Sequence, residues 1–306
     1  MNSEIKNEIS VSLLSVGAKV KYLPIDNYNT IRKMFFDIVK LQPYSRLFQD
    51  SYLKRFKKDY KQVFPGAKSI IAVAYPQPVT DVSFTLNDKI IKTILPPTYV
   101  YREREEKIKE ILTGALSRRG LKLADCPLPE KFTAVVSGLG KYGKNNLCYV
   151  EGMGSFNSPL LYLSDLPSEK TEISEPLMLK YCNNCTRCRD NCPTGAIGPE
   201  NFVIDPEKCE TFYNENEFEF PGWVLPNWQN TIVGCMKCQE VCPANKGVLH
   251  NIVRGPDFSE HESGAILNTG DFKDLPESAK AKITSLCMEN YYEIIPRNLK
   301  ILIDLS

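Results

Sequence analysis

Two cysteine runs decide the organisation of this chain, YCNNCTRCRDNCP at Tyr181–Pro193 and GCMKCQEVCP at Gly234–Pro243. The first run has the spacing C-x2-C-x2-C-x3-C followed by proline, and the second run also ends in Cys-Pro. Three closely spaced thiolates wrap the corners of one iron–sulfur cubane, and the fourth, next to proline, ligates a second cubane. The two runs therefore predict an electron-transfer module with two 4Fe-4S clusters.

The crossing of the Cys-Pro ligands divides the cysteines between the two clusters. We expect the first cluster to be bound by Cys182, Cys185, Cys188 and Cys242. The runs supply three ligands for the second cluster, Cys192, Cys235 and Cys238, because Ile232 stands where a symmetric second run would carry a cysteine. Cys209 is the remaining cysteine inside the module, so we expect it to complete the second cluster. Zinc also favours four-cysteine sites, but it does not explain two interleaved C-x3-C-P ends.

Composition excludes several other classes of protein. The chain has 306 residues, 11 cysteines and a net charge of +1, with 38 basic against 37 acidic residues. This balance gives no general attraction to nucleic acid or an anionic membrane, so such a partner would need a local patch. No secretory signal and no membrane-length apolar run is present, so we expect a cytoplasmic protein with reduced thiols. Three cysteines are expected to be buried free thiols: Cys126, Cys148 and Cys287.

Strand and helix signals alternate before the cysteine runs. Ala67–Tyr75 and Pro159–Leu163 are apolar and predict strands, as does Phe132–Val136, and a hairpin is expected around residues 86–88. Arg102–Arg119 has its apolar residues at helical spacing. The pattern predicts an α+β fold.

The predicted domains are residues 1–175, a cysteine-rich module at 176–245, and a short helical tail at 246–306 that packs on the body or binds a partner. The polar stretch Ser168–Pro176 marks the first boundary, and Asn214–Asn230 is expected to be an insertion loop within the module. Leu47–Val63 is basic and is expected to form an amphipathic helix. Its charges either face solvent or form a patch for an acidic partner.

A glycine loop, GLGKYG at Gly138–Gly143, matches G-x-G-x-x-G. Dinucleotide binding would require a helix directly after the loop, whereas KNNLCYVEGMGSF predicts loop and strand. Two interpretations stay open. The segment is an ordinary tight turn, or its backbone, with Lys141, Lys144 and Asn145, approaches a phosphate-bearing cofactor.

Four features in this order resemble the epoxyqueuosine reductases and their relatives, which include the corrinoid reductive dehalogenases. They are FPGAKSIIAVAYP, GLGKYGKNN, GSFNSPLLYLSDLP and the two cysteine runs, and they cover about residues 60 to 245. The resemblance implies a nitroreductase-like cobalamin-binding domain followed by a ferredoxin-like domain with two 4Fe-4S clusters. It also implies that electrons pass through the clusters to the cobalt of the corrinoid.

The resemblance assigns further residues by position. Those facing the corrinoid would be Gly138, Gly140, Gly143, Lys144, Asn145 and Ser155. Asp125, before Cys126-Pro127, matches the catalytic aspartate of the family and would act as a general acid. An aspartic acid keeps its proton near neutral pH only when it is buried, and a turn residue ahead of proline is the alternative role.

The resemblance leaves the substrate open. Longer family members that act on tRNA carry a helical-repeat extension which this sequence lacks, so neither length nor charge favours tRNA. We expect an electron donor such as a ferredoxin or flavodoxin. Two alternatives remain, a two-cluster electron-transfer protein without a corrinoid and a corrinoid-dependent reductive dehalogenase-like enzyme.

Overall fold

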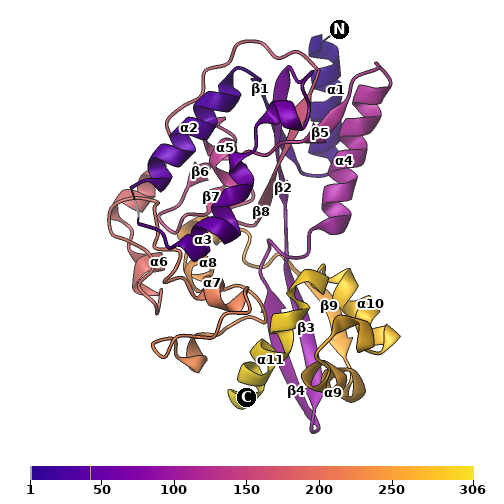
Figure 1. Cartoon of the computed structure of the whole chain (residues 1–306), viewed down its shortest axis with the longest axis vertical. Helices are drawn as coiled ribbons and strands as arrows, with labels where there is room; N and C mark the ends of the chain where they lie inside the picture. Colours follow the sequence, from indigo (N-terminus) through magenta and orange to yellow (C-terminus); the bar gives the residue numbers. More distant parts are fainter. Residues whose placement is uncertain (1, 42) are drawn as a thin grey trace. The chain divides into compact units, whose positions relative to one another are not determined.

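The chain forms two compact units in the computed structural model, which describes residues 2–41 and 43–306 (Figure 1). The first unit comprises the chain up to Pro76, Glu103–Met153 and Asn157–Lys180. The second unit comprises Gln77–Arg102, Gly154–Phe156 and Tyr181–Ser306. Both contain helices and strands, which confirms the α+β prediction.

A four-stranded sheet forms the centre of the first unit, in the order β1-β2-β8-β5 with every neighbouring pair antiparallel. The strands are β1 (Lys19–Pro24), β2 (Ser69–Pro76), β5 (Leu123–Asp125) and β8 (Asn157–Ser164). All residues of β2 before Pro76 are buried, because helices cover both faces of the sheet. The predicted strands at 67–75 and 159–163 are confirmed.

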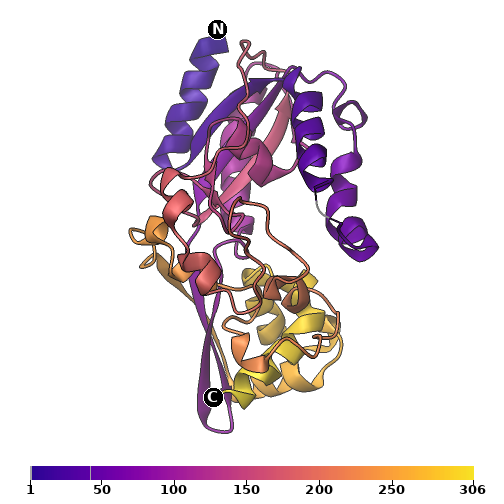
Figure 2. The ribbon, with the colours of Figure 1, turned by 90° about the vertical axis from the view of Figure 1, so that its left-hand side faces the viewer.

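Helices α1 (Asn2–Ser15) and α4 (Arg102–Ser117) cover one face of this sheet. Their apolar stripes, such as Ile9 of α1 and Leu112 of α4, pack against Ile71 and Val73 of β2. The other face is covered by α5 (Glu130–Val136), which contacts β2 and β8, and by α2 (Asn27–Val39), which contacts α5. Figure 2 shows α1 and α2 on opposite sides of the sheet.

The predicted strand at Phe132–Val136 is wrong, because these residues form helix α5. All five are buried, so the segment has no solvent-exposed side, and four of its residues are apolar. A short continuous apolar run of this kind fits a buried strand and a buried helix equally well. Pro129, at the N-cap position, starts the helix.

The prediction of a single helix at Leu47–Val63 is also wrong. The segment contains α3 (Arg46–Phe48), a π-helical turn at Gln49–Leu53 and two short 3-10 turns. The chain becomes extended at Lys58, where Tyr28 Oη donates a hydrogen bond of 2.7 Å to the Lys58 carbonyl. Two of its apolar side chains, Leu53 and Phe56, remain buried, while the lysines face solvent.

The second unit contains a three-stranded sheet in the order β4-β3-β9, with β3 antiparallel to β4 and parallel to β9. The strands are β3 (Val79–Leu86), β4 (Lys89–Leu95) and β9 (Ile252–Phe258). Asn87 and Asp88 both have positive φ, 50° and 60°, as a two-residue hairpin turn requires. The predicted hairpin is thereby confirmed.

Three C-terminal helices pack on this sheet, namely α9 (Glu260–Asn268), α10 (Glu277–Ser285) and α11 (Ile295–Asp304). Their shared core includes Phe84, Phe258 and Leu299. The cysteine-rich segment of the same unit contains only short helices: α6 (Arg187–Asp190), α7 (Glu210–Asn214) and α8 (Lys237–Glu240).

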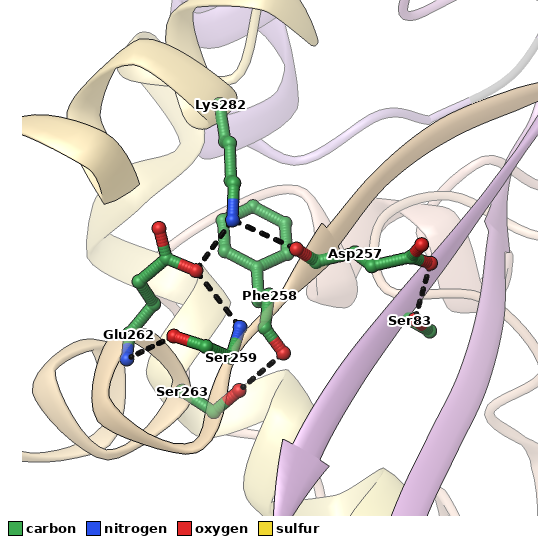
Figure 3. Close-up of polar contacts among 7 residues, drawn as sticks. All are labelled: Ser83, Asp257, Phe258, Ser259, Glu262, Ser263 and Lys282. Carbon is green, nitrogen blue, oxygen red and sulfur yellow. Dashed lines mark hydrogen bonds and ion pairs between the residues drawn. The ribbon is translucent and has the colours of Figure 1, made fainter.

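A polar cluster fixes the start of α9 beside β9 (Figure 3). Ser259 Oγ accepts a hydrogen bond from the Glu262 N–H, and Glu262 Oε2 accepts one of 2.8 Å from the Ser259 N–H. This capping box satisfies two backbone donors at the helix start. Lys282 Nζ of α10 lies 2.5 Å from Glu262 Oε2 and donates to the Asp257 carbonyl at 2.8 Å. The cluster therefore ties β9, α9 and α10 together.

This division differs from the predicted ranges in three respects. The hairpin β3–β4, placed by sequence in the first domain, packs with the C-terminal helices and belongs to the second unit. The segment after residue 245 shares that core and is not a separate tail. The polar stretch expected to be the boundary lies inside the first unit, and the chain enters the second unit at Tyr181.

Candidate metal centres and catalytic residues

The first cysteine run folds around α6. Cys182 lies in a 3-10 turn, the Cys185 N–H donates to the Cys182 carbonyl at 3.3 Å, and Cys188 lies within α6. Cys182 and Cys188 are buried, whereas Cys185 and Cys192 are partly exposed. Short C-x2-C turns of this kind direct successive thiols toward one point, as a cubane requires.

The second run repeats this arrangement around α8. Cys238 lies within α8, and Cys242 stands directly before a 3-10 turn at Pro243–Asn245. Helices α6 and α8 contact each other, and Asn191 Nδ2 donates to the Lys237 carbonyl at 2.7 Å. This bond joins the neighbour of Cys192 to the neighbour of Cys238.

The pKa of the Cys188 thiol is affected by three other cysteines, which therefore lie close to it. Burial and, to a smaller extent, the nearby Cys242, Cys182 and Cys185 together raise the pKa of Cys188 to about 11, against a backbone hydrogen bond at Arg189 that lowers it. These four cysteines are the ones predicted for the first cluster. Several thiolates close together are costly until a metal centre neutralises them, so this group suits iron ligation.

The other four cysteines are linked in pairs. Burial raises the pKa of Cys209 to about 11, and Cys192 contributes to this rise. Burial also raises the pKa of Cys235, with further contributions from Glu210 and Cys238, while Asn230 Nδ2, 3.2 Å from Cys235 Sγ, lowers it. In residues 2–41 and 43–306, no three Cys, His, Asp or Glu side chains form a site for a single metal ion.

Glu210 is a residue that sequence reasoning missed. It follows Cys209, is 3% exposed and influences the pKa of Cys235. Burial raises the pKa of Glu210 itself to about 7, while the nearby Cys235 and the charge of Lys237 lower it. The only sequence signal was its position next to Cys209.

The glycine loop connects α5 to a short hairpin formed by β6 (Lys141–Tyr142) and β7 (Cys148–Tyr149). No helix follows it, as predicted, which disfavours dinucleotide binding. A Cβ on Gly140 would lie 2.6 Å from Cys148 Sγ, and one on Gly143 would lie 2.4 Å from the Tyr149 ring. These two glycines are therefore required by the hairpin itself. Around Gly138, with φ of +74°, the space is open.

Lys144 and Asn145 are buried, with 4% and 5% of their surfaces exposed. Asn145 Nδ2 donates to Tyr149 Oη at 3.0 Å, which ties the loop to β7. Lys141, by contrast, is exposed. The loop thus offers one exposed cation and an open backbone turn at Gly138.

Ser155 belongs to the second unit, whereas the glycine loop belongs to the first. Its hydroxyl donates to Gln239 Oε1 at 2.8 Å and accepts from Asn245 Nδ2 at 2.8 Å, and its N–H donates to Asn245 Oδ1 at 2.8 Å. Gln239 and Asn245 flank Cys242. Ser155 thereby holds the second cysteine run in place.

Asp125 ends the edge strand β5, and its side chain is 77% exposed. Asp125 Oδ1 lies 3.4 Å from Lys109 Nζ. The burial that a general acid needs is therefore absent from this conformation. The next residue, Cys126, is buried, and burial raises the pKa of its thiol to about 12. Cys148 and Cys287 are also buried free thiols, as predicted.

A cavity of about 710 Å³ opens beside Cys242 in the second unit. Its lining includes Arg187, Asp190, Lys246 and Leu249. The cavity therefore combines opposite charges with an apolar wall at the edge of the first group of cysteines. In the described part of the chain, no helix has the length and apolar character needed to cross a membrane.

Comparison with known proteins identifies a double-cluster domain over the cysteine runs. The family model for a 4Fe-4S double cluster binding domain matches residues 181–245. This range contains all eight cysteines of the two groups. The chain therefore contains a domain of the double-cluster type.

Curated relatives match a larger part of the chain. An epoxyqueuosine reductase of Cyclobacterium marinum is 33% identical over 61% of this chain and 62% of its own length. One from Synechocystis sp. is 30% identical over 62% of this chain and 67% of its own length. The chain thus spans about three fifths of the first of these relatives.

Solved structures show the same fold. An epoxyqueuosine reductase from Bacillus subtilis, described with an aspartate catalytic loop swung out of its active site, has a TM-score of 0.71. An epoxyqueuosine reductase bound to an epoxyqueuosine-modified tRNA stem loop has a TM-score of 0.70. Both are 20% identical to this chain and cover 99% of it, and it covers 82% of each of them.

Proposed function

Because the chain belongs to the epoxyqueuosine reductase family, we propose that it is an iron–sulfur reductase whose two 4Fe-4S clusters deliver electrons to a bound corrinoid. The observation that carries the proposal is the grouping of Cys242 with Cys182, Cys185 and Cys188, which joins the two runs as crossed ligation requires. The second cluster would be held by Cys192, Cys209, Cys235 and Cys238. We propose a ferredoxin or flavodoxin as the electron donor and a cytoplasmic location.

The first unit would be the nitroreductase-like cobalamin-binding domain, and the second would contain the ferredoxin-like domain. When bound, a reduced corrinoid supplies a strongly reducing and nucleophilic cobalt. The open backbone at Gly138 and the exposed Lys141 fit a phosphate-bearing cofactor. Lys144 and Asn145 would support the same loop from inside. Ser155 fits the cofactor less well, because its hydroxyl is already engaged.

Asp125 is the proposed general acid. A carboxyl group that donates a proton near neutral pH must be shielded from water, and Asp125 is exposed. We propose that substrate binding covers the end of β5 and excludes water from this side chain. The relative from Bacillus subtilis, with its catalytic loop swung out, shows that such a loop can be open in this fold.

The proposed substrate is epoxyqueuosine in a tRNA stem loop, on the basis of the family and of the relative bound to such a stem loop. The test begins with anaerobic reconstitution of the purified chain with iron, sulfide and cobalamin. We expect about eight irons per chain and a corrinoid absorbance that shifts on reduction. Iron uptake without corrinoid binding would favour the alternative, a two-cluster electron-transfer protein.

Turnover is tested with a modified stem loop and two matched variants. Asp125→Asn should retain both clusters and the corrinoid but lose at least about 100-fold in turnover, as expected for a general acid. Asp37→Asn removes another exposed aspartate that pairs with lysines, and it should behave as wild type. Full activity of Asp125→Asn would exclude this residue as the acid. Activity on organohalides only would favour the dehalogenase-like alternative.

A further inference from the structure

A buried asparagine connects the helix after Cys209 to the turn before Cys235. Asn214 is the last residue of α7, whose N-cap is Cys209, and it is fully buried. Asn214 Oδ1 accepts a hydrogen bond of 2.6 Å from the Gly234 N–H, and Asn214 Nδ2 donates one of 2.8 Å to the Gly234 carbonyl. One side chain thus binds both polar groups of the residue that precedes Cys235.

The turn at Gly234 is held from its other side as well. Its φ is +78°, and a Cβ at this position would lie 2.4 Å from Tyr99 Oη. Tyr99 donates a hydrogen bond to Glu215, the neighbour of Asn214, and Thr231 Oγ1 donates to the Gly234 carbonyl at 2.6 Å. The backbone before Cys235 is therefore held from two sides, and its positive φ and the close Tyr99 ring favour glycine at this position.

Helix α11 supplies a second asparagine to the same place. Asn298 is fully buried, and its Nδ2 donates to the Asn214 carbonyl at 2.8 Å and to the Ile232 carbonyl at 2.9 Å. Ile232 is the position at which a symmetric second run would carry a cysteine. The neighbouring Arg297 donates to the Tyr213 carbonyl at 3.0 Å. Helix α11 is therefore hydrogen-bonded both to the helix that follows Cys209 and to the turn that precedes Cys235.

We propose that Asn214 and Asn298 are positioning residues for the second 4Fe-4S cluster. The proposal rests on the assignment of Cys209 to that cluster. A ligand within a C-x2-C turn is placed by its own short spacing, but Cys209 lies 26 positions before Cys235 and has no such help. The two buried amides supply the missing constraint, because each joins the Cys209 helix to the Gly234 turn. Replacing either amide would also leave buried backbone groups unpaired.

The test uses Asn214→Leu and Asn298→Leu, with Asn216→Ala as a matched control. Asn216 lies two residues after α7, and its Nδ2 donates a hydrogen bond of 2.8 Å to the Phe212 carbonyl of that helix. After anaerobic reconstitution, we expect Asn214→Leu and Asn298→Leu to bind about four irons instead of about eight. Their reduced electron paramagnetic resonance spectrum should simplify to that of one isolated cluster. The first cluster then reports that the unit is folded, and Asn216→Ala should match wild type.

Cys209→Ala separates failure of this proposal from failure of the ligand assignment. If Cys209→Ala alters the second cluster while both leucine variants keep the wild-type iron content and spectrum, the positioning role is wrong. If Cys209→Ala itself matches wild type, the assignment of Cys209 is wrong and the proposal fails with it. If a leucine variant retains neither cluster, Asn214→Asp is used to test the positioning role instead. This variant keeps the oxygen that accepts the hydrogen bond from the Gly234 N–H. A changed reduction potential of its second cluster supports the proposal, and an unchanged potential overturns it.

Discussion

At the scale of single residues, Gly140 before β6 and Cys148 of β7 constrain each other. Cys148 is buried, and its Sγ occupies the space that a Cβ on Gly140 would need. Packing of a short hairpin therefore explains Gly140 and Gly143, whereas the space around Gly138 is open. A G-x-G-x-x-G motif alone does not show whether the protein itself or a cofactor requires its glycines.

Gly140→Ala should destabilise the first unit. The added Cβ would lie 2.6 Å from Cys148 Sγ and 3.0 Å from the Tyr149 carbonyl oxygen, so the hairpin must shift. We expect a loss of about 1–3 kcal/mol in the free energy of unfolding, measured by urea denaturation. Gly114→Ala lies inside α4, where the new Cβ would make an ordinary 3.9 Å contact with the Arg118 side chain, and it should instead stabilise the fold by about 0.5–1 kcal/mol. Equal effects of the two changes would refute the packing explanation.

Cys126 should resist alkylation in the folded protein. Its thiol is 7% exposed, and burial raises its pKa to about 12, so very little reactive thiolate is present near pH 8. Iodoacetamide labelling, followed by mass spectrometry of the Cys126 peptide, should be at least about 100-fold slower than in urea. Labelling at the rate of the unfolded chain would instead show that the segment after Asp125 opens readily.

At the scale of elements, the errors of sequence interpretation have physical causes. Residues 132–136 are buried on every side, and a short, largely apolar run then fits a helix and a strand equally well. The hairpin at Asn87–Asp88 was predictable because its turn chemistry is local. The exposure of Asp125 could not be predicted from the sequence, because it depends on the position of β5 at the edge of the sheet. The contacts of Asn298 join residues 66 and 84 positions apart and leave no local signal.

The ion pair between Glu262 and Lys282 should stabilise the second unit (Figure 3). Burial alone would raise the pKa of Glu262, but hydrogen bonds from Lys282 and Ser259 outweigh burial and lower it to about 2. Glu262→Gln should therefore cost about 3 kcal/mol in the free energy of unfolding at pH 7. Glu277→Gln removes an exposed partner of Lys280 and should cost less than about 0.5 kcal/mol.

The same pair predicts a pH dependence. The pKa of Glu262 is about 2 in the folded protein against an ordinary value of 4.5. Its contribution is therefore complete above about pH 4.5 and is lost as the pH falls from there toward about 2. The stability difference between wild type and Glu262→Gln should be constant between about pH 7 and 5 and shrink below about pH 4.5. A difference that stays constant at lower pH would show that the charge of Glu262 is not its source.

At the scale of the whole molecule, a net charge of +1 conceals a local excess of cations. Between Tyr44 and Gln62 the chain carries six basic and two acidic side chains, which we call the basic segment. In it, Tyr44, Phe48 and Tyr52 form a row, with ring centroids 4.9 and 5.1 Å apart. The balanced composition leaves a local patch as the way to contact nucleic acid, and the folded chain shows aromatic rings gathered beside the charges of this segment.

The basic segment should contribute to binding of the proposed tRNA substrate. Lysines neutralise phosphates and aromatic rings stack on unpaired bases, so a stem loop matches both features. The double variant Lys54→Glu, Lys57→Glu should raise the Kd for the stem loop at least about tenfold. It should also reduce the slope of log Kd against log salt concentration by about one for each lysine removed. Lys89→Glu with Lys92→Glu reverses two exposed lysines on β4 and should leave Kd nearly unchanged. Both Kd values come from fluorescence anisotropy over a range of salt concentrations. If both double variants bind like wild type, the lysines of the basic segment only face solvent, and the stem loop must be held elsewhere.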